Sequence, residues 1–147
     1  MYKHLLVPTD GSTLSDKAVV QALGLAKAIG ARVTAMHVSP DYPPPMYMEG
    51  VILNPIPRRE YAKQAKADAA QVLDRVAKKA ATAGVACDTL HIIAAAPWEA
   101  IIAAARKGKC DVILMASHGR RGLAALLLGS ETVRVLTHSK VPVLVVR

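Results

Sequence analysis

The sequence predicts one α/β domain, a five-stranded parallel doubly wound sheet with helices on both faces. Three observations favour this fold. Strand-like and helix-like segments alternate along the whole chain, which is typical of a parallel sheet. The strand-like segments are short runs of Val, Ile and Leu without polar alternation, as expected for strands buried on both faces. The 147 residues fit a single domain, residues 1–147, and with no Phe its core must consist of Ala, Val, Leu and Ile.

The first strand is expected at residues 4–10, HLLVPTD, where a proline stops a short apolar run. A helix follows, with Ser12 or Thr13 as its N-cap and apolar residues recurring at helical spacing. Gly30 is a natural C-terminal stop for this helix. Residues 31–38, ARVTAMHV, predict the second strand.

A long loop is expected at residues 39–57, because six prolines interrupt any regular element there. Residues 59–83 then have the apolar spacing of one long amphipathic helix, which Gly84 ends. The third strand is expected at residues 85–93, VACDTLHII.

The last part of the chain predicts two more helices and two more strands. A helix begins with Pro97 in its first turn and ends before Gly108. Residues 110–117, CDVILMAS, form the fourth strand, a final helix begins at Ser130, and residues 141–147, VPVLVVR, form the fifth strand.

Composition and charge exclude several classes of function. The net charge is +8, but the basic residues interleave with acidic ones at helical spacing and no aromatic stacking platform accompanies them, so no specific nucleic-acid partner is expected. No apolar run reaches the ~20 residues that span a bilayer, so no membrane partner is expected. Cys87 and Cys110 lack CxxC spacing, which favours free thiols and a cytoplasmic location.

The segment ASHGRRGLAALLLGSET, residues 116–132, has the features of an anion site. Gly119 follows a strand and permits close approach of another group. Gly129 and Ser130 stand at the start of a helix, where the partial positive charge favours phosphate and where Ser130 is a candidate N-cap. A tight turn that packs the core is the competing interpretation of both glycines.

Other polar residues extend this candidate site. Asp10 ends the first strand, where the ligand crevice of a doubly wound sheet lies, although a helix-capping role competes. Arg120 could neutralise phosphate or simply be solvated. Glu131 would repel phosphate if it pointed inward, so we expect it to face solvent. His37 and His118 have no evident catalytic partner and are interpreted as structural.

Several catalytic motifs are absent from the sequence. There is no P-loop motif, no G-x-G-x-x-G after the first strand, no nucleophile elbow and no metal-ligand cluster. No strong general base is assembled against a reacting centre, which argues against efficient turnover.

The chain resembles a single-domain universal stress protein over its full length. The segments HLLVPTDGS, MHV, CDVILMASHGRRGLAALLLGS and VPVLVV carry the resemblance. Nucleotide-binding members of that family have Gly-x-x-Gly, nine residues, then Gly-Ser or Gly-Thr. Gly119, Gly129 and Ser130 match this motif, whereas Ala116 replaces its first glycine.

The resemblance implies a Rossmann-like fold of the adenine nucleotide alpha-hydrolase type that binds ATP, with Mg²⁺ as a possible companion, over the first and fourth strands. Pro8, Thr9, Val38 and Met115 would line the adenine side, Asp10 would face the ribose or base, and Thr132 would join the phosphate contacts. The candidate nucleotide-binding residues are Pro8, Thr9, Asp10, Val38, Met115, Ala116, Gly119, Arg120, Gly129, Ser130, Glu131 and Thr132.

The expected function is that of a dimeric stress-response regulator. Added outside the fourth strand, the fifth would leave an unpaired edge, and the resemblance implies that two such strands pair antiparallel through Val143, Leu144 and Val145. Two alternatives stay open at this point. Ala116 favours an interaction module that binds no nucleotide, and a slow ATPase is the enzymatic alternative.

Overall fold

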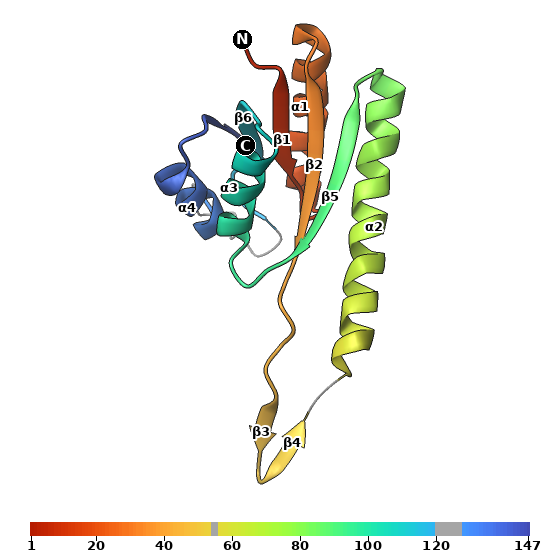
Figure 1. The fold of residues 1–147 in the computed structure, drawn as a ribbon, viewed down its shortest axis with the longest axis vertical. Helices are drawn as coiled ribbons and strands as arrows, with labels where there is room; N and C mark the ends of the chain where they lie inside the picture. The colour runs from red at the N-terminus through yellow and green to blue at the C-terminus, as the bar shows by residue number, and fades with distance from the viewer. Residues whose placement is uncertain (54–55, 120–127) are drawn as a thin grey trace.

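The computed structural model describes residues 1–53, 56–119 and 128–147, and contains the predicted parallel sheet. Five strands lie in the order β5-β2-β1-β6-β7, and every neighbouring pair is parallel (Figure 1). A separate two-stranded sheet joins β3 and β4. The elements are β1 His4–Pro8, α1 Thr13–Ile29, β2 Arg32–Ser39, β3 Met46–Met48, β4 Val51–Leu53, α2 Arg58–Ala83, β5 Cys87–Ile93, α3 Pro97–Lys107, β6 Val112–Ala116, α4 Ser130–His138 and β7 Val143–Val146.

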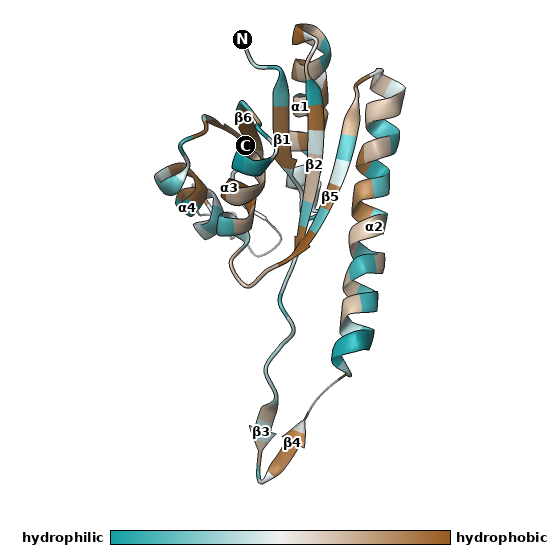
Figure 2. Cartoon of the chain, viewed as in Figure 1, coloured by the Kyte–Doolittle hydropathy of each residue, from teal (hydrophilic) through white to brown (hydrophobic). Residues whose placement is uncertain are grey.

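Helices cover both faces of the sheet, as predicted. On one face, α1 and α2 pack on strand residues such as Leu5 and Val33. On the other, α3 and α4 pack on Leu6, Met36 and Ile113. Figure 2 shows hydrophobic colours along β1 and on β4, whereas the turns of α2 nearest the hairpin are largely hydrophilic. Consecutive strand residues therefore belong to opposite cores, which explains the apolar runs without alternation.

Helix ends follow the local chemistry that predicted them. Ser12 is the N-cap of α1, and its side chain accepts a hydrogen bond from the Ser15 backbone N–H. Gly30 and Gly84 end α1 and α2 in the left-handed conformation, with φ of 69° and 72°. Pro97 is the first residue of α3. Each of these short signals therefore fixes where a helix meets the strand beside it.

The prediction of a structureless loop at residues 39–57 was wrong. Residues 46–53 form an antiparallel hairpin in which Tyr47 pairs with Ile52. Glu49 and Gly50 make its turn with φ of 47° and 82°, the positive values that tight hairpin turns require. The prolines flank the hairpin and do not prevent it from forming. Figure 1 shows the hairpin projecting away from the main sheet.

Candidate functional site

The direction in which successive strands are added reverses between the neighbouring strands β1 and β6, which is the topological switch point of the sheet. From β1 the chain moves outward to β2 and β5, whereas β6 and β7 lie on the other side. The carboxyl ends of β1 and β6 therefore open into the crevice where doubly wound sheets bind ligands. Residues 9–11 follow β1 there, and residues 117–119 follow β6.

Asp10 and Gly119 meet across this crevice. A Cβ built on Gly119 would stand 2.5 Å from Asp10 Oδ2, so only glycine lets the carboxylate come this close. The other oxygen, Oδ1, accepts a hydrogen bond of 2.9 Å from the Ser12 backbone N–H. Asp10 thus supports the turn into α1 and lies at the crevice, whereas the N-cap of α1 is Ser12.

Gly129 closes the loop that leaves β6. Its N–H donates to the Ser117 carbonyl at 2.7 Å, and a Cβ there would lie 3.1 Å from His118 Cβ. Gly129 is also the N-cap of α4, so the expectation that Ser130 caps this helix was wrong. Ser130 is its exposed first residue, and Gly129, as a glycine, has no side chain with which to cap the helix. Among residues 1–53, 56–119 and 128–147, no side chain accepts from the first N–H groups of α4, which are therefore open to a ligand or to water.

The expectation that Glu131 faces solvent holds in part, because its side chain is 38% exposed but is also tied to α3. Its Oε2 accepts a hydrogen bond of 2.8 Å from the Trp98 backbone N–H in the first turn of α3. Its Oε1 lies 3.6 Å from the Arg134 guanidinium, one turn further along α4. The carboxylate is thereby held at the start of α3, in keeping with the favourable effect of negative charge at a helix N-terminus.

Thr132 and Ala116 join α4 to β6. Both residues are buried, and Thr132 Oγ1 donates to the Ala116 carbonyl at 3.1 Å. The Thr132 hydroxyl is therefore engaged in holding the helix on the strand, which leaves its backbone N–H as the group that could face an anion.

Residues predicted for the adenine side fall on two faces of the sheet. Val38 and Met115 pack within the α3–α4 core. Thr9 points the other way, because its buried hydroxyl lies 3.0 Å from the Ser15 hydroxyl, and its carbonyl accepts from His37 Nδ1 at 2.9 Å. Pro8 ends β1 between these faces and is partly exposed.

Arg120, also predicted to contact nucleotide, lies outside the residues that the structure describes.

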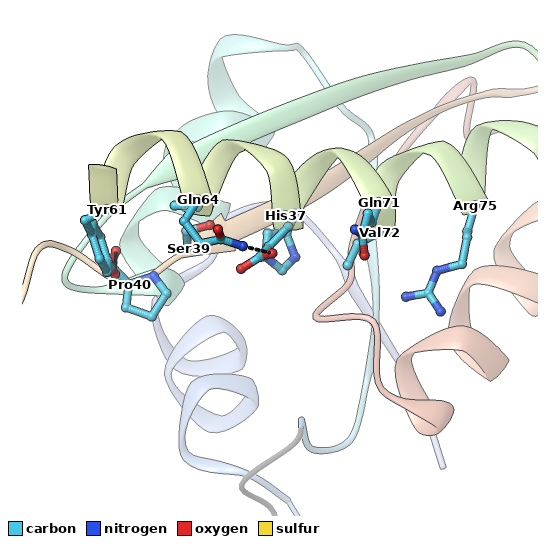
Figure 3. A pocket seen from close by; sticks show the side chains of 10 residues that line it. His37, Ser39, Pro40, Tyr61, Gln64, Gln71, Val72 and Arg75 are labelled. Atoms are coloured by element: carbon cyan, nitrogen blue, oxygen red, sulfur yellow. Dashed lines mark hydrogen bonds between the residues drawn. The ribbon is translucent and has the colours of Figure 1, made fainter. Parts of the chain in front are cut away.

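Sequence reasoning missed two clefts along α2, on the α1–α2 side of the sheet. The larger, about 470 Å³, runs beneath α2 from Tyr61 to Arg75 and meets the end of β2 at His37 and Ser39 (Figure 3). The smaller, about 210 Å³, lies between Arg75 and the start of α1. Helical spacing places these α2 residues on one face, but the sequence could not show which strand end they would meet.

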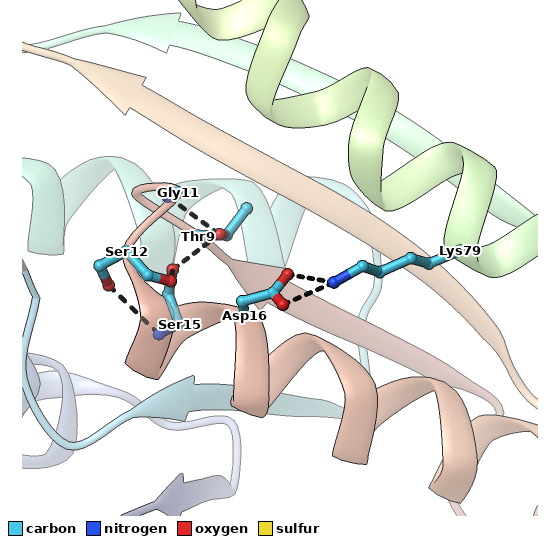
Figure 4. A network of polar contacts seen from close by, with 6 residues as sticks. All are labelled: Thr9, Gly11, Ser12, Ser15, Asp16 and Lys79. Atoms are coloured by element: carbon cyan, nitrogen blue, oxygen red, sulfur yellow. Dashed lines mark hydrogen bonds and ion pairs between the residues drawn. The ribbon is translucent and has the colours of Figure 1, made fainter.

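Polar contacts stiffen the rim of these clefts. Gly11 donates its N–H to Thr9 Oγ1 at 3.2 Å, and Asp16 of α1 binds Lys79 of α2 with a nitrogen–oxygen distance of 2.5 Å (Figure 4). His91 Nε2 lies 2.9 Å from Ser39 Oγ. Burial, then the neighbouring His37 and Lys66, lower the pKa of His91. His37 and His91 thus each have a hydrogen-bond partner in the fold, at Thr9 and Ser39.

No three His, Cys, Asp or Glu side chains form a metal site within residues 1–53, 56–119 and 128–147. Across the same part of the chain, no helix is long and apolar enough to cross a membrane. Cys87 and Cys110 are free thiols, and burial raises the pKa of each.

Comparisons with known proteins agree with this architecture. Residues 1–147 match the model of the universal stress protein family. Universal stress protein MJ0531 of Methanocaldococcus jannaschii is 33% identical over 100% of this chain and 83% of its own length. A structure of MJ0577 superposes with a TM-score of 0.81 at 25% identity, covering 99% of this chain and 96% of that one. A universal stress protein solved in complex with cAMP gives 0.67 at 26% identity, covering 99% and 97%.

Proposed function

Because the chain belongs to the universal stress protein family, we propose that it binds an adenine nucleotide, ATP above all, at the carboxyl ends of β1 and β6. The observation that carries the proposal is the start of α4, where the N-cap residue Gly129 has no side chain to occupy the first N–H groups of the helix. Gly129 lets the start of α4 pack closely against His118, and the adjacent helix N–H groups offer hydrogen bonds and partial positive charge to phosphate. Glu131, which would oppose an anion, is held toward α3 by its bond to Trp98.

The nucleoside part would lie over the end of β1. In this arrangement the carboxylate of Asp10 accepts hydrogen bonds from the ribose hydroxyls. Val38, which is partly buried, offers an apolar surface to the base on the α3–α4 side of the sheet, and Met115 belongs to the buried core there. The relative solved with cAMP, 26% identical over nearly the whole of both chains, supports an adenine nucleotide as the ligand class.

Thr9 supports the site in this proposal without touching the ligand. Its N–H donates to Met36, its carbonyl accepts from His37, and its hydroxyl meets Ser15. Each polar group of Thr9 thus already has a partner, so the residue fixes the direction of the chain into Asp10.

Mg²⁺ would enter with ATP and be held by phosphate oxygens and water, because the described residues present no cluster of carboxylates for it. The two described histidines of the region, His37 and His118, are hydrogen-bonded to Thr9 and Ser117. We therefore propose nucleotide binding that regulates a partner, with hydrolysis as a minor activity at most.

A homodimer through β7 is the second part of the proposal. β7 lies at the edge of the sheet beside β6, and Leu144 is 41% exposed. The opposite edge strand, β5, carries Asp88 paired with Arg32 of β2, a charge of the kind that discourages edge pairing. An uncharged β7 edge is the better template for a second copy.

The decisive experiment places a negative charge at the proposed phosphate site. Ser130→Glu alters an exposed first residue of α4, where an acidic side chain favours the helix, so the fold is retained. Thr13→Glu is the matched control, because Thr13 is the exposed first residue of α1. Calorimetric titration with ATP, AMP and cAMP should show affinity lost in Ser130→Glu and kept in Thr13→Glu.

Two results would count against this assignment. Equal binding by the wild type and Ser130→Glu would move the phosphate site elsewhere. Failure of the wild type to bind any of the three nucleotides would favour the interaction module that Ala116 suggests.

A further inference from the structure

The hairpin of residues 46–53, here called the arm, exposes an unusual amount of apolar surface. Its side chains at 46, 47, 48, 51 and 52 are Met, Tyr, Met, Val and Ile, and each is between 58% and 73% exposed. Neither strand of the arm contains a charged residue. A two-stranded hairpin is marginal by itself in water, and exposed apolar patches of this kind mark interaction sites.

The base of the arm is fixed to the body. Tyr42 donates its hydroxyl to the Ile56 carbonyl at 2.5 Å, and its ring meets that of Tyr61 edge to face at 5.4 Å. Tyr61 of α2 donates in turn to the Pro40 carbonyl at 2.8 Å. The guanidinium of Arg58 lies 5.4 Å from the centre of the Tyr42 ring. The arm is therefore presented from an anchored base, which reduces the ordering cost of a docking event.

Charge distinguishes the arm from the rest of the chain. Glu49, in its turn, is the single charged residue of residues 42–57, whereas the whole chain carries +8. The first turns of α2, at the arm's base, hold four basic residues against Glu60: Arg58, Arg59, Lys63 and Lys66. The turn of the arm is acidic, and its base is net positive even with Asp41 and Glu60 set against the four basic residues.

We infer that the arm docks on the arm of a second copy of this chain, antiparallel and about a two-fold axis. Each turn, with Glu49, then reaches the base of the other arm, where Arg59 is exposed. The apolar strand residues of the two arms cover each other. A two-fold arrangement makes the contact self-complementary, as closed dimers require, and the unlike charges fix its direction. A lipid surface fits less well, because Glu49 would meet anionic headgroups first.

This contact differs from pairing through β7. The arm projects from the end of the molecule where β2 and α2 adjoin the hairpin, whereas β7 is an edge of the main sheet (Figure 1). A chain that uses both contacts would form assemblies larger than a dimer. The inference also stands independently of nucleotide binding.

The first test removes apolar surface from the arm. Tyr47→Ser with Ile52→Ser changes a cross-strand pair that makes no core contact, so the body should fold as before. Val20→Ser on α1 is the matched control, since Val20 is 54% exposed outside the arm. Sedimentation of the full chain from micromolar to submillimolar concentration should show association weakened about tenfold or more in the arm variant and unchanged in the control.

The second test exchanges charges across the proposed contact. Glu49→Lys alone and Arg59→Glu alone each place like charges together and should weaken association. The double variant restores unlike charges and should recover association toward the wild type. Residue 49 has a positive φ, which strains any residue with a side chain. Lys is no more branched at Cβ than Glu, so the turn is equally strained in the wild type and in Glu49→Lys.

Three results would overturn the inference. One is a wild type that sediments as a single chain at every concentration. Another is an arm variant whose association equals that of wild type and Val20→Ser. The third is a membrane role: the wild type would bind phosphatidylglycerol vesicles, the arm variant would not, and the two would self-associate equally.

Discussion

Glu131 on α4 accepts a hydrogen bond of 2.8 Å from the backbone N–H of Trp98 on α3. The contact joins the first turns of two helices that cover the same face of the sheet. It supplies a side-chain partner to α3, whose N-cap position is held by Ala96 and provides none. It also turns a carboxylate away from the start of α4, so one residue serves both stability and the proposed anion site.

Replacing Glu131 should therefore reduce stability. Glu131→Ala leaves the Trp98 N–H without its acceptor, and we expect the free energy of unfolding to fall by roughly 1 kcal/mol, as for loss of a helix cap. Glu131→Gln keeps an acceptor oxygen and should lose less. Urea unfolding at neutral pH measures both. Equal stability of the wild type and Glu131→Ala would show that water accepts the Trp98 N–H hydrogen bond as well as the Glu131 carboxylate does.

Gly119→Ala should weaken nucleotide binding without unfolding the chain. The new Cβ would displace the Asp10 carboxylate, a flexible group, so the crevice changes more than the core. We expect at least about a tenfold loss of affinity, equivalent to ~1.4 kcal/mol. Calorimetric titration with ATP measures the effect.

Gly24→Ala is the control for this change. A Cβ on Gly24, within α1, meets no atom within 4 Å, so binding should persist while helix propensity improves. Unchanged affinity in Gly119→Ala would remove Asp10 from the proposed site.

Much of the fold could be predicted because its signals are local. Apolar runs marked the five strands of the main sheet, and Ser12, Gly30, Gly84 and Pro97 marked helix ends. The hairpin of residues 46–53 also had a local signal, the dipeptide Glu49–Gly50 between two apolar triplets. The surrounding prolines outweighed that signal in the sequence interpretation.

The details of the site could not be predicted, because they depend on contacts between distant residues. The bond from Trp98 to Glu131 joins residues 33 positions apart, and nothing local to Glu131 indicates it. The close approach of Asp10 to Gly119 arises only once β1 and β6 are neighbours. The sequence could indicate which residues lie at strand ends, but not how their side chains divide between ligand and fold.

Stability should decrease on mild acidification because of His4. This buried side chain lies 2.8 Å from Thr34 Oγ1, and burial, then the charge of Arg32, lower its pKa below the ordinary value of 6.5. The unfolded chain therefore takes up a proton that the folded chain resists. The stabilisation is complete above pH 6.5 and is lost as pH falls toward the folded pKa.

His4→Gln should flatten this pH dependence, although its stability at neutral pH falls. Urea unfolding at a series of pH values from neutral to mildly acidic measures both effects. His91, whose pKa is also lowered, contributes in the same direction, so His4→Gln with His91→Gln should be flatter still. A double variant with the slope of the wild type would assign the dependence to other groups.

The edge of β7 gives the last prediction, because its backbone groups divide cleanly between two sides. The carbonyl of Pro142 accepts a hydrogen bond from Ile113 of β6, and that of Val146 accepts one from Ser117, the residue after β6. The backbone groups of the even-numbered residues of β7 therefore point toward β6. The N–H and C=O of Val143 and Val145 therefore point to the open edge. Val143→Lys with Val145→Pro should block pairing with a second copy and leave the ladder to β6 intact.

Light scattering can isolate this contact in the background of Tyr47→Ser with Ile52→Ser. Pairing through β7 should then give about twice the chain mass of 15.6 kDa, and adding the β7 substitutions should give one chain. Thr89→Pro on β5 is the control. The backbone groups of Ala86 and Ala94 bond to Val33 and Ser39 of β2, so even-numbered residues of this strand point toward β2. The N–H of Thr89, an odd-numbered residue, therefore points to the open edge and its loss leaves the sheet intact. If Thr89→Pro dissociated the dimer and the β7 substitutions left it unchanged, the pairing edge would be β5.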